Sequence, residues 1–135
     1  MTIIGIDYGR KRLGIAVSDA GHRIATPLTV IERRGAESAI RKIAEEQGAT
    51  RIVVGLPVRT DGKPSAMADE SAAFAEGLRE QTGLPVEMCD ERLSTAQAER
   101  AMLDADVSRA RRKKSLDKVA ARIILQSYLD AQQKR

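Results

Sequence analysis

Acidic residues follow separate apolar stretches of the chain. Asp7 ends the run TIIGID, Asp90 and Glu91 follow the run PVEMC, and Asp117 lies near the start of the last apolar-periodic segment. Carboxylates that meet at one place repel one another unless one is protonated or a divalent cation lies between them. A site of this kind, holding Mg²⁺ or Mn²⁺, is suited to hydrolysis of phosphodiesters.

The cysteine and histidine content restricts the metal. The chain has one cysteine, Cys89, and one histidine, His22, which excludes a zinc site of the Cys/His kind. Any bound metal is therefore expected to take oxygen ligands, which favours a hard ion. His22 is expected in a hairpin turn, and Cys89 is expected to be a small buried residue of a short strand.

Positive charge is concentrated between residues 109 and 118. Six basic residues stand there against one acid, a net charge of +5, whereas the whole chain carries +4, so the remainder is close to neutral at −1. A concentrated positive segment suits a polyphosphate backbone, and a solvated surface loop is the alternative. Aromatic residues are 2% of the chain, which weakens the case for a base-stacking platform. The basic residues are Arg109, Arg111, Arg112, Lys113, Lys114 and Lys118.

Hydrophobic periodicity predicts the elements that must position these residues. Alternation at a period of two indicates strands, a period near 3.6 indicates helices, and Gly, Pro and Ser mark their ends. Pro27 cannot donate to a strand ladder, which places the third strand at the sheet edge. The expected strands are 2–8, 12–19, 23–31, 51–55 and 85–89, and the expected helices are 36–47, 66–81, 94–103 and one that begins at Ser115 after a basic loop.

This order predicts one α/β domain over residues 1–135. Three antiparallel strands are followed by crossovers into parallel ones, which gives a mixed five-stranded sheet of order 3-2-1-4-5 with strand 2 antiparallel, flanked by helices. The carboxyl ends of strands 1, 4 and 5 then share one edge, where open α/β sheets bind ligands. Asp7, Asp90 and Glu91 belong to that edge, and Asp117 is expected in the first turn of the last helix.

The composition also bounds the location of the protein. A hydrophobic fraction of 42% with 31% charged residues is typical of a globular domain, and no stretch resembles a transmembrane span. Asp7 interrupts the N-terminal apolar run and no basic region precedes it, so a secretory signal is not expected. Cytoplasmic residence and no membrane partner are the default expectation.

Four motifs, in order along the chain, resemble one family. They are DYGRKRLGIAVSD at 7–19, GLP at 55–57, DERLST at 90–95 and KKSLDKVAARIILQSYLD at 113–130. Together they resemble the YqgF (RuvX-like) family, which has an RNase H-like fold. The resemblance implies a cytoplasmic bacterial nuclease that acts in 5′-end maturation of the 16S rRNA precursor, with kinship to Holliday junction resolvases.

The resemblance also implies roles for particular residues. Asp7, Glu91 and Asp117 match the metal-binding acids, around one or two Mg²⁺ or Mn²⁺ ions and a water nucleophile, and Asp90 is the fallback ligand. The chain departs from related resolvases where strand 4 ends in GLP, without an acid. Strand 5 lies about 9–10 Å from strand 1, so Glu91 would have to reach inward. The candidates for contacting the scissile strand are Arg12, Arg92 and Lys113 or Lys114, within a basic group that also includes Arg111 and Arg112.

Three rival functions remain open at this point. The first is resolution of four-way DNA junctions, which needs two symmetrically arranged active sites. The second is a non-catalytic RNA-binding factor that keeps the fold and the basic segment. The third is an ATP-binding lobe, because DYGRKRLG also resembles a phosphate-binding hairpin, but the chain supplies only one lobe. The expected partners are precursor rRNA or branched DNA and the small-subunit precursor, and the protein is expected to be a monomer or a homodimer.

Overall fold

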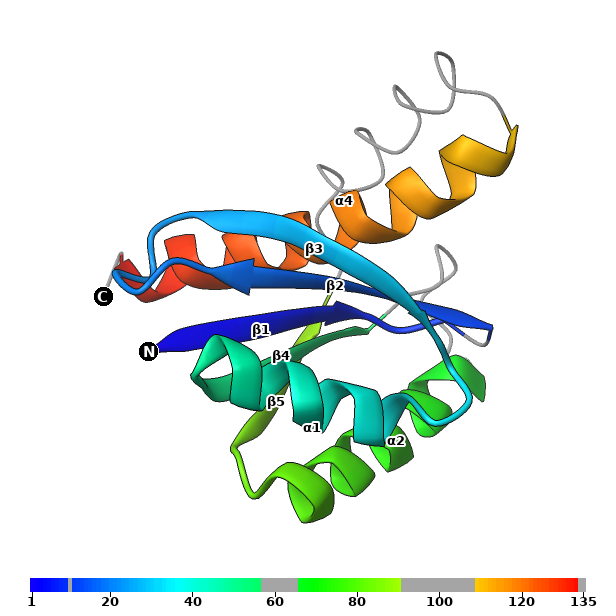
Figure 1. Cartoon of the computed structure of the whole chain (residues 1–135), viewed down its shortest axis with the longest axis horizontal. Coiled ribbons are helices and arrows are strands. Elements are labelled where there is room, and N and C mark those ends of the chain that lie inside the picture. The colour runs from blue at the N-terminus through cyan, green and yellow to red at the C-terminus, as the bar shows by residue number, and fades with distance from the viewer. Residues whose placement is uncertain (10, 57–65, 91–108, 134–135) are drawn as a thin grey trace.

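A five-stranded sheet with helices on both faces forms the protein. The computed structural model describes residues 1–9, 11–56, 66–90 and 109–133 (Figure 1). The strands run in the order β3-β2-β1-β4-β5, as the sequence predicts. The elements are β1 (Thr2–Asp7), β2 (Arg12–Ser18), β3 (Ala25–Glu32), α1 (Ala36–Gln47), β4 (Ala49–Leu56), α2 (Ala66–Thr82), β5 (Val86–Asp90) and α4 (Arg109–Gln133).

The pairing of the strands confirms the predicted topology. β1 is antiparallel to β2 and parallel to β4, and β4 is parallel to β5. β3, which contains Pro27, lies at the sheet edge. Because β1, β4 and β5 point the same way, Asp7, Leu56 and Asp90 end their strands at one edge of the sheet.

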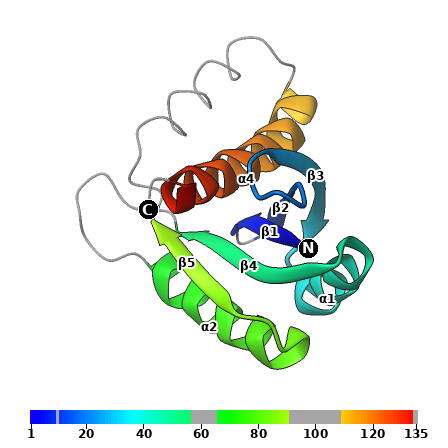
Figure 2. The same ribbon diagram turned by 90° about the vertical axis from the view of Figure 1, so that its left-hand side faces the viewer.

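The two faces of the sheet carry different helices. α1 and α2 cover one face and α4 covers the other (Figure 2). Alternation along the central strands divides the core accordingly: Ile4 and Ile52 pack towards α1 and α2, whereas Ile3 and Val53 pack towards α4. β4 is thus buried on both faces, as its unbroken apolar run predicts.

Local sequence signals account well for the bounds of α1. The helix covers Ala36–Gln47, the predicted range, and buries Ala36, Ile40 and Ala44. Gly48 follows in the left-handed conformation, with φ of 63°, and its N–H bonds back to the carbonyl groups of Ala44 and Glu45. This is the helix ending that glycine favours.

The start of α4 corrects a prediction. The helix begins at Arg109, not at Ser115, so the basic segment is the start of the helix and not a preceding loop. Asp117 consequently lies in the third turn and not in the first. Arg, Lys and Ala are strong helix formers, and no Gly or Pro separates residue 109 from Ser115, so the serine does not need to act as a cap.

Of two further predictions, one is only partly met and the other is not tested by the described residues. Cys89 is only partly buried. The helix predicted over 94–103 lies outside the described residues. None of the described helices is long and apolar enough to cross a membrane.

Candidate functional site

Asp7 ends the central strand on the face that α4 covers. Ile3 packs with α4 residues, and an added Cβ at Gly5 would lie 2.6 Å from Cβ of Leu125, so alternate residues of β1 face that helix. Asp7 is the next position of this series. The sheet register pairs it with Gly14 of β2 and Gly55 of β4. Neither strand neighbour therefore brings a side chain to the face beside this carboxylate.

Close packing fixes α4 over the sheet. A Cβ added at Gly55 would lie 2.9 Å from Cγ1 and 3.1 Å from Cγ2 of Ile124, closer than ordinary contact allows. At Gly5 it would also lie 3.2 Å from the carbonyl oxygen of Ala121. Glycines at both positions let the helix backbone approach β1 and β4, which fixes the position of every residue that α4 carries.

The first turns of α4 lie at the end of the sheet where Asp7 lies. Leu129 packs in one cluster with Ile3, whereas Leu125 lies over Gly5, so the helix runs opposite to β1 (Figure 1). Asp117 precedes Ala121 by one helical turn, on the side of Asp7. The basic residues Arg111, Arg112, Lys113 and Lys114 occupy the turns before it. The side chains of Asp117 and of these basic residues lie outside the described part of the structure.

β5 brings a further position into the same row. The register pairs Gly55 with Cys89, so Asp7, Gly55 and Cys89 lie side by side across three strands. Asp90, the fallback ligand, pairs in turn with Leu56 at the end of β5. Glu91 and Arg92 lie outside the described residues. Among the residues that the structure does describe, no group of three His, Cys, Asp or Glu side chains is arranged to hold a metal ion.

Arg12 begins β2 at the same end of the sheet. It lies two residues before Gly14, the register partner of Asp7, and pairs with Glu32 of β3. The hairpin between β1 and β2 is tight, because a Cβ at Gly9 would collide with the carbonyl oxygen of Arg12. The structure thus brings Asp7 and Arg12 to one end of one hairpin.

Arg33, which no sequence pattern predicted as important, stabilises the end of β1. Tyr8, directly after Asp7, is 5% exposed and its ring lies 5.2 Å from that of Phe74 in α2. The Arg33 guanidinium lies over the Phe74 ring at 4.6 Å, and its Nε donates to the Tyr8 hydroxyl at 3.2 Å. Cation–π contact and this hydrogen bond hold the chain where it leaves β1.

Arg33 is itself fixed by neighbours along the chain. Its Nη1 donates to a carboxylate oxygen of Glu37 at 2.7 Å, and its backbone N–H donates to the carbonyl of Lys11 at 2.9 Å. Burial opposes the charged form of Arg33, but Tyr8 and Glu37 outweigh it, so the pKa is raised. No local motif marks Arg33 in the sequence, since its ring partners, Tyr8 and Phe74, are distant in the chain.

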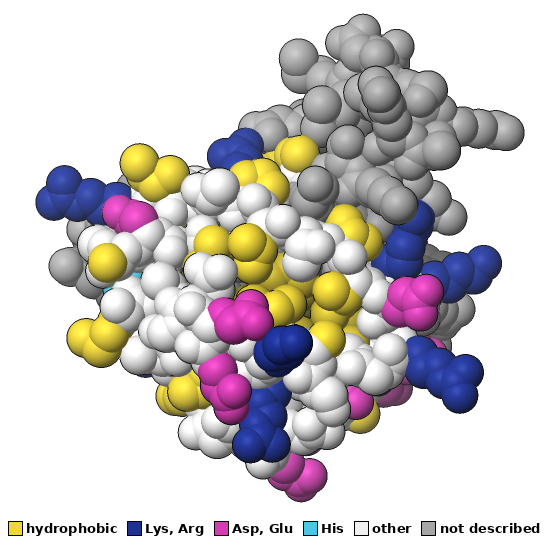
Figure 3. Space-filling view, in the orientation of Figure 1, with side chains coloured by type: hydrophobic (Ala, Val, Ile, Leu, Met, Phe, Trp, Pro, Cys, Tyr) yellow, Lys and Arg dark blue, Asp and Glu magenta, His cyan; other side chains and the backbone are white. Residues whose placement is uncertain are grey.

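The described basic side chains show no single dense patch on the face that Figure 3 presents. Lys and Arg side chains lie there at separate places, at the margin and in the lower middle of the view, with Asp and Glu side chains among them. The highest density of positive charge along the sequence is at the beginning of α4 instead.

Comparison with known proteins identifies the family. A family model described as "RuvX: Holliday junction resolvase" matches residues 1–131. The chain belongs to the RuvX family. This membership confirms the predicted resemblance, and with it the expectation that the protein is a hydrolase of the nuclease class.

RuvX relatives match over nearly the whole chain. A protein of Symbiobacterium thermophilum is 49% identical over 138 residues, which cover 100% of this chain and 96% of the relative. A protein of Cereibacter sphaeroides is 47% identical, covering 95% and 82% of the two chains. Both are named "Putative pre-16S rRNA nuclease".

Solved structures confirm the RNase H-like fold. Thermus thermophilus RuvC in complex with a Holliday junction superposes with a TM-score of 0.62 at 16% identity, covering 98% of this chain and 96% of that one. Fowlpox virus resolvase, in complex with junction DNA, gives 0.59 at 12% identity over 98% and 99%. At this identity the likeness establishes the fold alone.

Proposed function

We propose that this RuvX protein is a divalent-metal-dependent endonuclease for structured nucleic acid, with Asp7, Glu91 and Asp117 as its metal ligands. The observation that carries the proposal is the placement of Asp7. It stands at the carboxyl end of the central strand, on the face under α4, with glycine as its register partner on both sides. The first turns of α4, the helix that carries Asp117, lie on the side of this same end.

The residues available at this end suit a hard cation. The candidate ligands are carboxylates, whose oxygens are what Mg²⁺ and Mn²⁺ prefer, and His22 lies in the turn between β2 and β3, at the other end of the sheet. One or two such ions would activate a water for attack on phosphorus and stabilise the leaving oxygen. The ligand atoms therefore suit such an ion, and other residues of the chain must bind and orient the substrate.

Alternation along β5 favours Glu91 over Asp90 as the third ligand. Cys89 packs with the residues that face α4, and Glu87 lies 3.7 Å from Arg51 beside Tyr128 of α4, so these two positions face that helix. A chain that continues extended from Cys89 would return to the α4 face at Glu91. The order of preference is therefore Glu91 first and Asp90 second.

The basic residues would hold and orient the substrate. Arg12 stands at the start of β2 near Asp7, and Arg111, Arg112, Lys113 and Lys114 begin α4. Their charges match phosphate oxygens, and Arg92, which follows Glu91 in the sequence, is a further candidate for a phosphate contact. These residues would position one phosphodiester against the carboxylates.

The favoured substrate is the precursor of 16S rRNA, cleaved during 5′-end processing in the cytoplasm as part of the assembly of the small ribosomal subunit. The names of the relatives support this substrate. The second candidate is a four-way DNA junction, which the family description and the junction complexes of the structural neighbours support. Resolution of a junction requires two active sites, and hence a dimer.

A side-by-side cleavage assay tests the proposal. Purified protein is incubated with a precursor 16S leader RNA and with a four-way DNA junction, each with Mg²⁺, Mn²⁺ or a chelator. We expect metal-dependent cleavage that falls at least about a hundredfold in the Asp7→Asn protein, because the ligands support several kcal/mol of transition-state stabilisation. Cleavage of the RNA by a monomer favours rRNA processing, whereas symmetric nicking by a dimer favours junction resolution.

Matched variants separate the site from general effects. Glu91→Gln and Asp117→Asn should lose activity as Asp7→Asn does, whereas Asp90→Asn should retain most of it. Asp130→Asn is the control, because this exposed acid lies near the other end of α4 and bonds only Gln126 among the described residues. Undiminished cleavage by the Asp7→Asn protein would refute the assignment. Retained RNA binding without cleavage in the wild type would instead indicate a non-catalytic factor.

A further inference from the structure

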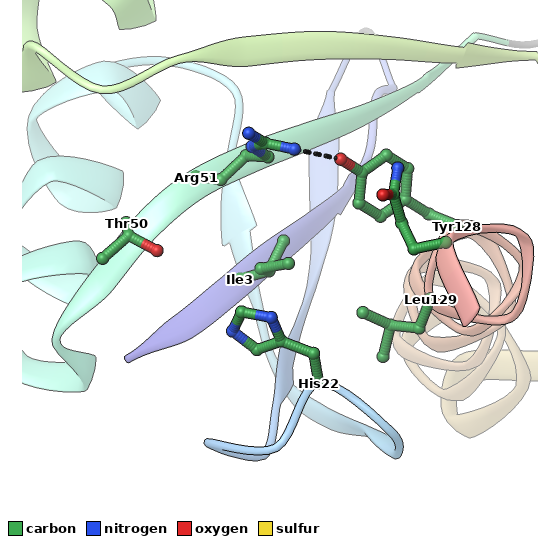
Figure 4. A pocket seen from close by; sticks show the side chains of 7 residues that line it. Ile3, His22, Thr50, Arg51, Tyr128 and Leu129 are labelled. Atoms are coloured by element: carbon green, nitrogen blue, oxygen red, sulfur yellow. Dashed lines mark hydrogen bonds between the residues drawn. The ribbon is translucent and has the colours of Figure 1, made fainter. Parts of the chain in front are cut away.

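A pocket lies at the end of the sheet opposite Asp7. It has a volume of about 360 Å³ and is lined by residues from the starts of β1 and β4, the turn between β2 and β3, and the last turns of α4 (Figure 4). Ile3 and Leu129, which are 5% and 1% exposed, form its floor. Its size is at the lower end of the range for small-molecule sites. The nuclease function proposed above makes no use of this pocket.

Arg51 presents a fixed positive charge to the pocket. Its Nη1 donates to the Tyr128 hydroxyl at 2.6 Å and lies 3.7 Å from Oε1 of Glu87. Both contacts use the same nitrogen, so Nε and Nη2 form no hydrogen bond with any residue of the described ranges. The hydrogen bond with Tyr128 raises the pKa of Arg51, and the guanidinium stays charged. Two donor nitrogens thus remain on an oriented guanidinium.

Glu87 acts on the tyrosine as well as on the arginine. Burial raises the pKa of Tyr128, and the nearby Glu87 raises it further because the neutral hydroxyl can donate to the carboxylate. The contacts among Arg51, Tyr128 and Glu87 therefore orient the first two side chains at the wall of the pocket, with Glu87 behind them. The acid itself does not line the pocket, and none of the described lining residues is acidic.

His22 is held at the pocket wall by an unusual backbone conformation. Its φ is 56°, and it is the only non-glycine residue with a positive φ in the part of the chain that the structure describes. Such a conformation carries strain and persists where surrounding contacts enforce it. The ring Nε2 lies 3.1 Å from the carbonyl oxygen of Met1, which fixes the imidazole. Thr50 and Gln132 add a hydroxyl and an amide to the lining.

We propose that this pocket binds a small phosphate-bearing molecule of the nucleoside monophosphate class. The planar guanidinium of Arg51 matches two phosphate oxygens, and the amide of Gln132 offers a further donor. The Thr50 hydroxyl donates to the carbonyl of Thr2 at 3.4 Å, so its oxygen is left to accept a hydrogen bond from a hydroxyl of the ligand. The non-phosphate part would lie against the Tyr128 ring and this hydroxyl, which both line the pocket.

NMR of the single histidine gives a direct test. His22 is the only histidine of the chain, so its imidazole resonance is unambiguous. Wild-type protein is titrated with inorganic phosphate, with adenosine 5′-monophosphate and with a short single-stranded oligonucleotide, at constant pH and at an ionic strength set by chloride. We expect a saturable shift with phosphate and tighter binding of the monophosphate, since the Tyr128 ring and the Thr50 hydroxyl add contacts to the nucleoside.

Two variants and a control decide the assignment. Arg51→Gln and Gln132→Glu should weaken monophosphate binding by about tenfold or more, the first by removing charge-assisted bonds and the second by repulsion. Gln132 is exposed, so this second variant keeps the test valid if Arg51→Gln fails to fold. Arg41→Gln, on the exposed side of α1, should bind as the wild type does. No saturable shift with either small ligand, equal affinity in all variants, or a shift with the oligonucleotide alone would overturn the proposal.

Discussion

Substitution of Gly55 by alanine tests the close seating of α4 on the sheet. The added Cβ would approach Cγ1 and Cγ2 of Ile124 to 2.9 and 3.1 Å, against about 3.5–4 Å for relaxed carbon contacts. Ile124 is 3% exposed, and a β-branched side chain in a helix has essentially one rotamer, so it cannot turn aside. We expect overpacking to reduce the free energy of unfolding by about 1–3 kcal/mol.

The cost should be relieved by trimming the side chain that causes it. Ile124→Ala alone should cost about 2–4 kcal/mol, because it leaves a cavity. In the double variant the new methyl group enters that cavity, so the combined loss should be smaller than the sum by about 1–2 kcal/mol. Urea unfolding of the wild type, both single variants and the double variant gives the coupling energy from shifts in the midpoint at a constant slope.

Gly77 offers a matched control within α2. There an added Cβ would meet only Cγ of Glu37, at an ordinary 3.8 Å, so Gly77→Ala should stabilise the protein by about 0.5–1 kcal/mol through helix propensity. The Gly55→Ala protein should also cleave more slowly, since displacement of α4 moves Asp117 away from Asp7. A neutral Gly55→Ala, or additive effects of the two substitutions, would show that Ile124 does not press on this position.

Three further predictions follow from described contacts. Arg33→Met should lower the free energy of unfolding by about 1–2 kcal/mol, because a hydrogen bond and two ring contacts are lost. It should also slow cleavage although Asp7 is intact. Urea unfolding measures the first effect and the cleavage assay the second, and unchanged cleavage would refute a positioning role. Backbone N–H groups of Ile24 and Arg23 lower the pKa of Asp19, so its contribution to stability is present above the ordinary carboxyl pKa and is lost as the pH falls through the lowered value. Asp19→Asn should therefore flatten the acid side of a plot of the free energy of unfolding against pH. An unchanged plot would contradict this. Neutralising the basic residues at the start of α4 should weaken nucleic-acid binding and reduce the slope of the logarithm of the binding constant against that of the salt concentration by about 0.7–0.9 for each lost phosphate contact. Filter binding at several salt concentrations measures this slope. An unchanged slope would place the binding surface elsewhere. The residues to neutralise are Arg111, Arg112 and Lys113.

Most of the secondary structure is already encoded in local patterns. The period-two alternation of the first strands, the unbroken run of β4 and the glycine after Gln47 depend on neighbours within a few residues. Apart from the start of α4, the predicted elements that the structure describes lie within a few residues of their observed bounds. The strand order also followed, because short hairpins and right-handed crossovers leave few topologies. The predicted start of α4 at Ser115 was wrong, because the dense positive charge of the basic segment suggested a loop, whereas the high helix propensity of Arg, Lys and Ala extends the helix back to Arg109.

The candidate site is only partly local. The sequence alone identified Asp7 and the carboxylates expected beside it, and family resemblance assigned them roles. Tertiary structure decided which face Asp7 occupies, which glycines flank it and that Arg33 braces the residue after it. Most of those facts arise from contacts between residues 25 or more positions apart, such as Tyr8 with Arg33 and Gly5 with Leu125.

The sequence by itself determined most of the elements, the sheet order and which side chains are available for chemistry, because periodicity, turn residues and side-chain type are properties of short segments. Only the tertiary structure decided how closely α4 approaches the sheet and that Ile3, His22, Arg51 and Tyr128 enclose a pocket at the opposite end. The physical reason is that packing and pocket shape depend on which side chains from distant segments meet, and no spacing along the chain records that.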